Sequence, residues 1–110
     1  MQLLVIVLNK VDRLEDLLKE FLKVGIKGAT VLDSTGMARV LHDTIPIFGS
    51  IKMLINEGYS YSKTLFVVLQ EGQVELAINS LKQVVGDISQ PDVGILFTIP
   101  ISHVEGGNLS

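Results

Sequence analysis

The apolar residues of this chain change their spacing twice in the same order, and this repeat constrains the fold more than any other feature. The unbroken apolar run 3–8 is typical of a buried strand. Apolar residues then recur at three- and four-residue steps over 14–22, as on one face of a helix. Gly25 is expected to end this helix, because glycine adopts the left-handed conformation at little cost. A second strand is expected over 29–34.

The second half of the chain repeats this plan. Residues 64–69 predict a third strand, apolar spacing from Gln73 to Gly86 predicts a second helix, and 93–99 predict the last strand. Two consecutive strand–helix–strand units of similar length are typical of the ferredoxin-like α+β fold. We therefore predict a single domain, 1–110, with a four-stranded antiparallel sheet and two helices on one of its faces.

Three of the expected strands are apolar on both faces. A sheet that helices cover on one side should alternate apolar and polar residues, but 3–8, 65–69 and 95–97 do not alternate. The first and third strands are central in this topology. The composition agrees, since 47% of the residues are apolar and the mean hydropathy is +0.45. We expect other subunits, or the segment between the two halves, to cover the second face; a monomer that exposes this surface is the alternative.

The segment between the two halves, 36–62, has 27 residues, which is longer than an ordinary connection. Pro46 suits the first position of a helix, and apolar residues then recur at helical spacing as far as Gly58. We predict a short amphipathic helix over 46–57. It serves either as a lid on the open sheet face or as a segment that binds a partner.

Few residues carry reactive chemistry. The absence of cysteine excludes disulfides and thiolate sites, and a net charge of −3 argues against nucleic-acid binding. His42 and His103 lie far apart, without the spacing of metal ligands. His42 and Asp43 could join a metal site shared between subunits, although a solvated loop is the simpler interpretation. No nucleophile elbow and no carboxylate pair in apolar surroundings is present, so we expect no catalysis and no bound metal ion.

The apolar character does not predict insertion into a membrane. The longest unbroken aliphatic run has six residues, whereas a spanning helix needs about 20. The first residues lack the basic region of a secretory signal. A cytoplasmic location is therefore expected.

The exit from the second strand is the best candidate for a ligand site. Gly36 can present backbone N–H groups, and the guanidinium of Arg39 suits a phosphate or carboxylate. Gly94, at the start of the last strand, permits close approach of a ligand or a subunit. A simple strand exit without a ligand is the alternative.

These segments resemble the PII nitrogen-regulatory family. Residues 22–31 are similar to the family's passage that ends in Gly-Ile-Lys-Gly-Met-Thr-Val, and Gly-Met-Ala-Arg at 36–39 is similar to its Gly-Phe-Gly-Arg. Residues 94–101 resemble its ending Gly-Lys-Ile-Phe-Val-Phe-Pro-Val. The resemblance covers nearly all of the chain outside 40–62.

The resemblance implies a signalling protein without catalytic activity. It implies a homotrimer whose sheets face inward, with a small ligand such as AMP, ADP or ATP in the clefts between subunits. It also implies that the long loop, 40–62, controls a partner protein. A ligand-free trimeric assembly module, similar in fold to the cation-tolerance proteins, is the alternative. The residues that would line the cleft are Thr30, Gly36, Met37, Ala38, Arg39 and Gly94.

The sequence departs from the family where the phosphates would bind. Ile95 stands in place of a lysine, Val40 in place of a glutamine, and 102–106 lacks the family's basic pair. Each lost charge-assisted hydrogen bond costs about 1.5–3 kcal/mol. We therefore expect ATP to bind less tightly than in the family. Tyr59 and Tyr61 do not match the family's tyrosine signature, so no uridylylation switch is expected.

Overall fold

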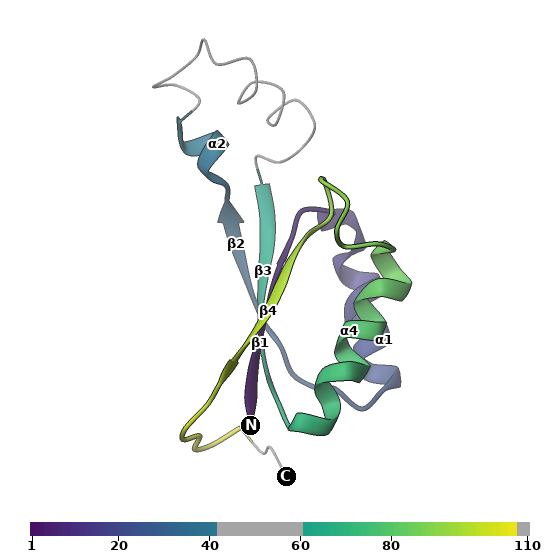
Figure 1. Cartoon of the computed structure of the whole chain (residues 1–110), viewed down its shortest axis with the longest axis vertical. Helices are drawn as coiled ribbons and strands as arrows, with labels where there is room; N and C mark the ends of the chain where they lie inside the picture. The colour runs from purple at the N-terminus through teal and green to yellow at the C-terminus, as the bar shows by residue number, and fades with distance from the viewer. Residues whose placement is uncertain (42–60, 108–110) are drawn as a thin grey trace.

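The computed structural model describes residues 1–41 and 61–107, except for the side chain of Ala38. Its centre is a four-stranded antiparallel sheet, in which β1 pairs with β3 on one side and with β4 on the other (Figure 1). The first and third strands are central, as the sequence predicts. The strands, in their spatial order, are β2 (Thr30–Thr35), β3 (Tyr61–Leu69), β1 (Gln2–Leu8) and β4 (Gly94–Pro100).

Both long helices cover the same face of the sheet, which confirms the ferredoxin-like α+β fold (Figure 1). They are α1 (Leu14–Lys23), which follows the 3-10 turn η1 (Val11–Arg13), and α4 (Glu71–Val85). The core lies between helices and sheet because each strand turns alternate side chains toward the helices. Its buried residues are Leu4, Ile6, Leu8, Leu17, Phe21, Ile26, Leu65, Val67, Leu69, Ala77, Leu81, Val85 and Val93.

Glycine ends α1, as predicted. Gly25 has a φ of +86°, and its N–H donates to the carbonyl of Leu22 at 3.2 Å. The N–H of Ile26 donates to the carbonyl of Phe21 at 2.9 Å. These two bonds form a Schellman motif, which satisfies carbonyls at the helix end. The chain then turns toward the start of β2.

The bounds of the expected loop differ from the prediction. A short helix, α2 (Met37–Leu41), follows β2 almost directly, and β3 begins already at Tyr61. The segment 36–62 is therefore not one uniform connection. The helix predicted over 46–57 lies outside the described residues, as do His42 and Asp43.

The sheet face opposite the helices, here called the open face, is largely apolar. Because Leu4, Ile6 and Leu8 point toward the helices, their neighbours along β1 point away from them. The register then aligns Phe66, Val5 and Phe97 across three strands. Strands that are apolar on both faces are thus confirmed. The apolar residues of the open face are Leu3, Val5, Val7, Leu32, Phe66, Val68, Ile95, Phe97 and Ile99.

Polar side chains border the open face near α2. The hydroxyl of Ser34 lies 2.7 Å from that of Ser62 and 2.8 Å from that of Thr64. On the other side of the sheet, Lys63 forms an ion pair with Asp33. These contacts join β2 to β3 through side chains as well as backbone. None of the described helices has the length and apolar character needed to cross a bilayer.

Candidate functional site

The exit of β2 forms a closed helical turn. The carbonyl of Gly36 accepts hydrogen bonds from the N–H groups of Arg39 at 3.1 Å and Val40 at 3.2 Å. The guanidinium carbon of Arg39 lies 5.6 Å from the centre of the Tyr61 ring, within the range of a cation–π contact. This contact links α2 to the first residue of β3. It holds the arginine beside the sheet while its side chain stays exposed.

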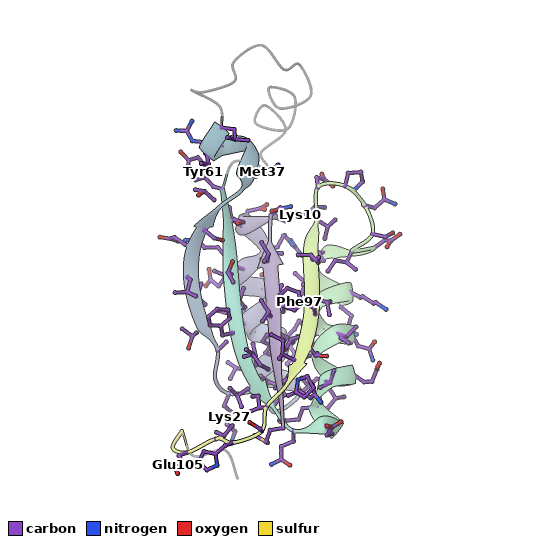
Figure 2. The ribbon with its side chains drawn as sticks, turned by 60° about the vertical axis from the view of Figure 1, so that its left-hand side comes forward. Lys10, Lys27, Met37, Tyr61, Phe97 and Glu105 are labelled. Atoms are coloured by element: carbon purple, nitrogen blue, oxygen red, sulfur yellow. The ribbon has the colours of Figure 1, made fainter. Side chains whose placement is uncertain are left out.

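Apolar side chains surround Arg39 on this end of the molecule. Met37 is 77% exposed, Val40 66% and Tyr61 57%. Figure 2 shows Met37 and Tyr61 together at one end of the sheet, with Lys27 and Glu105 at the opposite end. The α2 end therefore combines the guanidinium of Arg39 with several exposed apolar groups, which suits a ligand or partner that has both an anionic and an apolar part.

Thr30 lies at the other end of β2. It pairs with Phe66, whereas Thr35, beside α2, pairs with Tyr61. Five residue steps along a strand correspond to about 17 Å. A single chain therefore does not bring Thr30 together with Arg39.

Gly94 lies on the opposite edge of the sheet from β2. Three strand spacings separate the two edge strands, or about 14 Å. The φ of Gly94 is +147°, and a Cβ atom there would lie 2.2 Å from the carbonyl oxygen of Val7. The sequence predicts that a ligand or a subunit approaches Gly94 closely, but in the structure β1 of the same chain makes this approach. Of the six residues predicted to line the ligand cleft, only residues 36–39 therefore lie close together within one chain. Thr30 and Gly94 lie elsewhere on the sheet.

The turn between α4 and β4 contains a carboxylate that sequence reasoning missed. Asp87 accepts hydrogen bonds from the hydroxyl of Ser89 at 2.7 Å and from its N–H at 2.9 Å. These bonds hold the pKa of Asp87 below its ordinary value, and the bond from the Ser89 hydroxyl has the largest effect. An acidic residue two positions before a serine is a signal for such a turn. Asp87 therefore stays ionised and fixes this turn.

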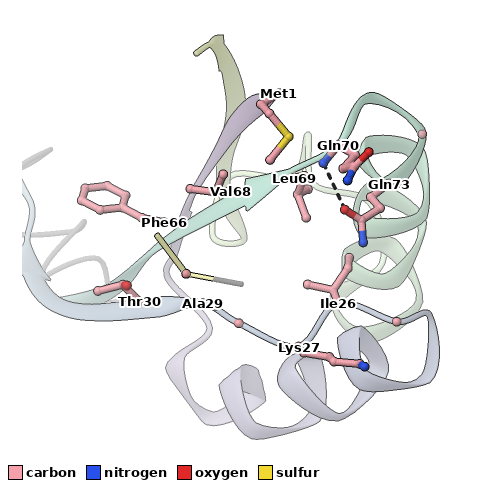
Figure 3. A pocket seen from close by; sticks show the side chains of 14 residues that line it. Met1, Ile26, Lys27, Ala29, Thr30, Phe66, Val68, Leu69, Gln70 and Gln73 are labelled. Atoms are coloured by element: carbon pink, nitrogen blue, oxygen red, sulfur yellow. Dashed lines mark hydrogen bonds between the residues drawn. The ribbon is translucent and has the colours of Figure 1, made fainter. Parts of the chain in front are cut away.

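A cavity of about 860 Å³ opens at the end of the sheet opposite α2 (Figure 3). Sequence analysis identified only Thr30 among its lining residues. The walls come from the connection between α1 and β2, the end of β3 and the start of α4. The lining residues are Met1, Gly25, Ile26, Lys27, Gly28, Ala29, Thr30, Phe66, Val68, Leu69, Gln70, Gly72, Gln73 and Gly107.

Within the described ranges, no three histidine, aspartate or glutamate side chains gather as a metal site would require. His103 has an exposed carboxylate neighbour, since its Nε2 lies 2.8 Å from Glu105. Both side chains belong to the exposed segment that follows β4. This pair lies on the surface and not in a cleft.

Comparisons with known proteins identify the fold. No protein-family model and no curated protein sequence matches the chain. A crystal structure of Arabidopsis thaliana PII bound to citrate is similar to it, with a TM-score of 0.64 and 23% sequence identity. The match covers 92% of this chain and 77% of the Arabidopsis chain. The sheet order and the two helices on one face therefore constitute a PII-like fold.

Proposed function

We propose that this protein is a PII-like regulator that acts without catalysis. Three copies would pack around their open faces, a small ligand would bind between neighbouring copies near α2, and the 40–62 segment would contact a partner protein. The observation that carries the proposal is a PII-like fold in which the described residues leave an apolar face of the sheet exposed. Nitrogen regulation in the cytoplasm is the process that the resemblance suggests.

The open face supports the proposed trimer. Phe97 is 43% exposed, Ile95 56% and Ile99 45%, although all three lie on a sheet whose other face is covered by helices. A contiguous apolar patch of this kind is typical of a surface that another protein covers. Three copies related by rotation would bury the same patch on every chain.

The separation of the candidate residues supports a site between subunits. Thr30 lies about 17 Å from the α2 end, and Gly94 about 14 Å away across the sheet, too far for one chain to hold a small ligand with all of them. A neighbouring copy would supply the missing wall. Under this proposal, Gly36, Met37, Ala38 and Arg39 of one chain bind the ligand together with Thr30 or Gly94 of another.

The proposed ligand is a small anion with fewer negative charges than ATP. Arg39 supplies one cation at the α2 end, and Ile95 supplies none. We therefore favour AMP or ADP over ATP among the adenine nucleotides. Citrate is the ligand named for the Arabidopsis PII structure, so a small carboxylate is a second candidate.

The position of α2 suggests how ligand binding would reach a partner. Arg39 belongs to the helix that leads directly into the 42–60 segment, and its contact with Tyr61 lies where that segment ends. A ligand that draws Arg39 away from Tyr61 would change how both ends of the segment are held. Such a ligand would shift the segment between conformations that differ in affinity for the partner.

Native mass spectrometry tests this proposal. We expect a mass of three chains that takes up about three molecules of AMP or ADP, or of citrate, one for each interface. Arg39→Gln should weaken ligand binding about tenfold, because one charge-assisted contact is lost. Lys19→Gln, at an exposed position on α1, is the control and should bind as the wild type does.

Other outcomes would contradict the proposal at different points. A monomer would contradict the trimer. A trimer that ignores all these ligands would favour the ligand-free assembly module, and equal affinity in Arg39→Gln would place the ligand away from α2.

A further inference from the structure

Tyr61 is an exposed aromatic residue that neither the core nor the proposed trimer explains. Of the other aromatic side chains that the structure describes, Phe21 is buried in the core, and Phe66 and Phe97 lie on the open face. Tyr61 lies an even number of steps along β3 from the buried Leu65, so it points to the side away from the open face. Its ring nevertheless stays exposed and is therefore available to a ligand.

The contact between Tyr61 and Arg39 joins an aromatic surface to an anion-binding one. The guanidinium carbon of Arg39 lies over the ring, 5.6 Å from its centre. A cation–π contact uses the positive charge of a guanidinium and leaves its N–H donors for an anion. Among the described residues, no carboxylate forms an ion pair with Arg39. A ligand could therefore bind to the cation and to the ring at the same time.

Met37 extends the aromatic part of this surface. Its side chain is strongly exposed, and Figure 2 shows it together with Tyr61 at this end of the sheet. A thioether makes favourable contacts with aromatic rings because its sulfur is polarizable. The surface thus suits a planar ring better than it suits an anion that has only polar groups.

We propose that Tyr61 selects the ligand of the site near α2 by stacking on an aromatic ring of that ligand. The inference rests on the function proposed above and chooses between its two ligand classes, in favour of a nucleotide. The phosphate would draw Arg39 away from the ring of Tyr61, and the base would take its place there, since every base has a π-face that stacks on aromatic side chains. Citrate would bind to Arg39 but would leave the ring of Tyr61 uncovered.

Isothermal titration calorimetry with AMP and ribose 5-phosphate tests this proposal, because the two ligands share a phosphate and only AMP has a base. We expect the wild type to bind AMP at least about tenfold more tightly than ribose 5-phosphate. Tyr61→Leu keeps an apolar side chain without a ring and should lose this difference. Tyr61→Phe keeps the ring and, as the matched control, should bind AMP as the wild type does. Arg39→Gln should weaken both ligands by about the same factor.

Tyrosine fluorescence reports on the ring directly, because the chain has two tyrosines and no tryptophan. AMP should quench the fluorescence of the wild type, whereas ribose 5-phosphate should not. In Tyr61→Phe, which keeps only Tyr59, AMP should still bind but the quenching should be lost. A structural role of Tyr61 would not separate binding from quenching in this way.

Several results would overturn the proposal. Equal affinity of Tyr61→Leu and the wild type for AMP would place the base elsewhere, and so would quenching that persists in Tyr61→Phe. If Tyr61→Leu lost the same factor of affinity for both ligands, Tyr61 would only position Arg39. A wild type that binds citrate but not AMP would contradict the role of Tyr61 and keep the proposed ligand-sensing function, whereas a wild type that binds neither would contradict both.

Discussion

At the scale of single residues, the contact at Gly94 gives the sharpest test of the fold. A methyl group there would lie 2.2 Å from the carbonyl oxygen of Val7, and the φ of +147° is unfavourable for any side chain. Either the two strands separate locally or the start of β4 moves. We expect Gly94→Ala to lower the free energy of unfolding by about 2–4 kcal/mol in urea denaturation.

Gly28→Ala is the matched control for this variant. The added methyl group meets nothing within 4 Å and the φ is not positive, so the free energy of unfolding should stay within about 0.5 kcal/mol of the wild type. If Gly94→Ala were as stable as Gly28→Ala, the contact with Val7 would not explain the glycine. Approach of a ligand or a subunit would then be the better explanation.

Gly94 also shows what a sequence can predict about one residue. A glycine at the start of a strand permits close approach of another group, and the sequence predicts a ligand or a subunit at Gly94, whereas in the structure the backbone of Val7 in the same chain lies there. The sequence does not say which group approaches, because glycine lacks the side chain that would identify its neighbour. The predicted topology places 30 and 94 on the two edge strands, but it does not say how far either residue lies from Arg39.

At the scale of secondary-structure elements, Arg13 connects the two long helices. Its guanidinium donates to the carbonyl of Val84, in the last turn of α4, at 3.1 Å, and it also lies 3.2 Å from a carboxylate oxygen of Asp16. The contact with Val84 satisfies a carbonyl that the helix itself leaves free, and it places a cation at the negative end of the helix dipole.

We expect Arg13→Ala to lower the free energy of unfolding by about 1–2 kcal/mol. Hydrogen exchange of the amides in the last turn of α4 should become faster in this variant. Lys19→Ala removes a more exposed ion pair, in which the charged atoms lie 3.8 Å apart, and should change stability by less than about 0.5 kcal/mol. Equal effects of the two variants would mean that the contact with Val84 adds nothing beyond a surface charge.

All four strands and both long helices follow from the spacing of apolar residues, because burial on one face imposes that spacing. The features that apolar spacing does not predict have physical causes. The helix α2 has five residues, too few for a periodic pattern. The start of β3, at Tyr61, precedes the apolar run, and Ser62 is joined to β2 by a hydroxyl contact with Ser34 rather than by apolar packing. Leu22 fits the apolar face of α1 by spacing, yet it is 63% exposed, because it lies about 100° around the helix from the buried Phe21, at the edge of that face.

At the scale of the whole molecule, the sequence predicts an apolar sheet face that the two long helices do not cover. The apolar strands indicate that something covers the open face, but apolar spacing is the same whether a second chain or a segment of the same chain does so. The candidate ligand residues raise the same problem, since they lie at separate ends and edges of one sheet. The covering of the open face and the proposed nucleotide site therefore both depend on how several chains assemble.

A charge on the open face tests the assembly directly. Phe97 pairs with Val5 in the middle of this face, and we expect Phe97→Glu to convert the proposed trimer to a monomer in analytical ultracentrifugation. A carboxylate there would be buried without a partner, which costs several kcal/mol at each interface. Because Phe97 is 43% exposed in the single chain, the far-ultraviolet circular dichroism should remain that of a folded protein.

Leu76→Glu is the matched control, since Leu76 has nearly the same exposure, 42%, but lies on α4, on the other side of the molecule from the open face. This variant should keep the mass of the wild type. If both variants remained trimeric, the open face would not be the interface. If only the Leu76→Glu variant dissociated, the helices rather than the sheet would form the interface between chains. This result would contradict the proposed ligand site between α2 of one chain and the sheet of its neighbour.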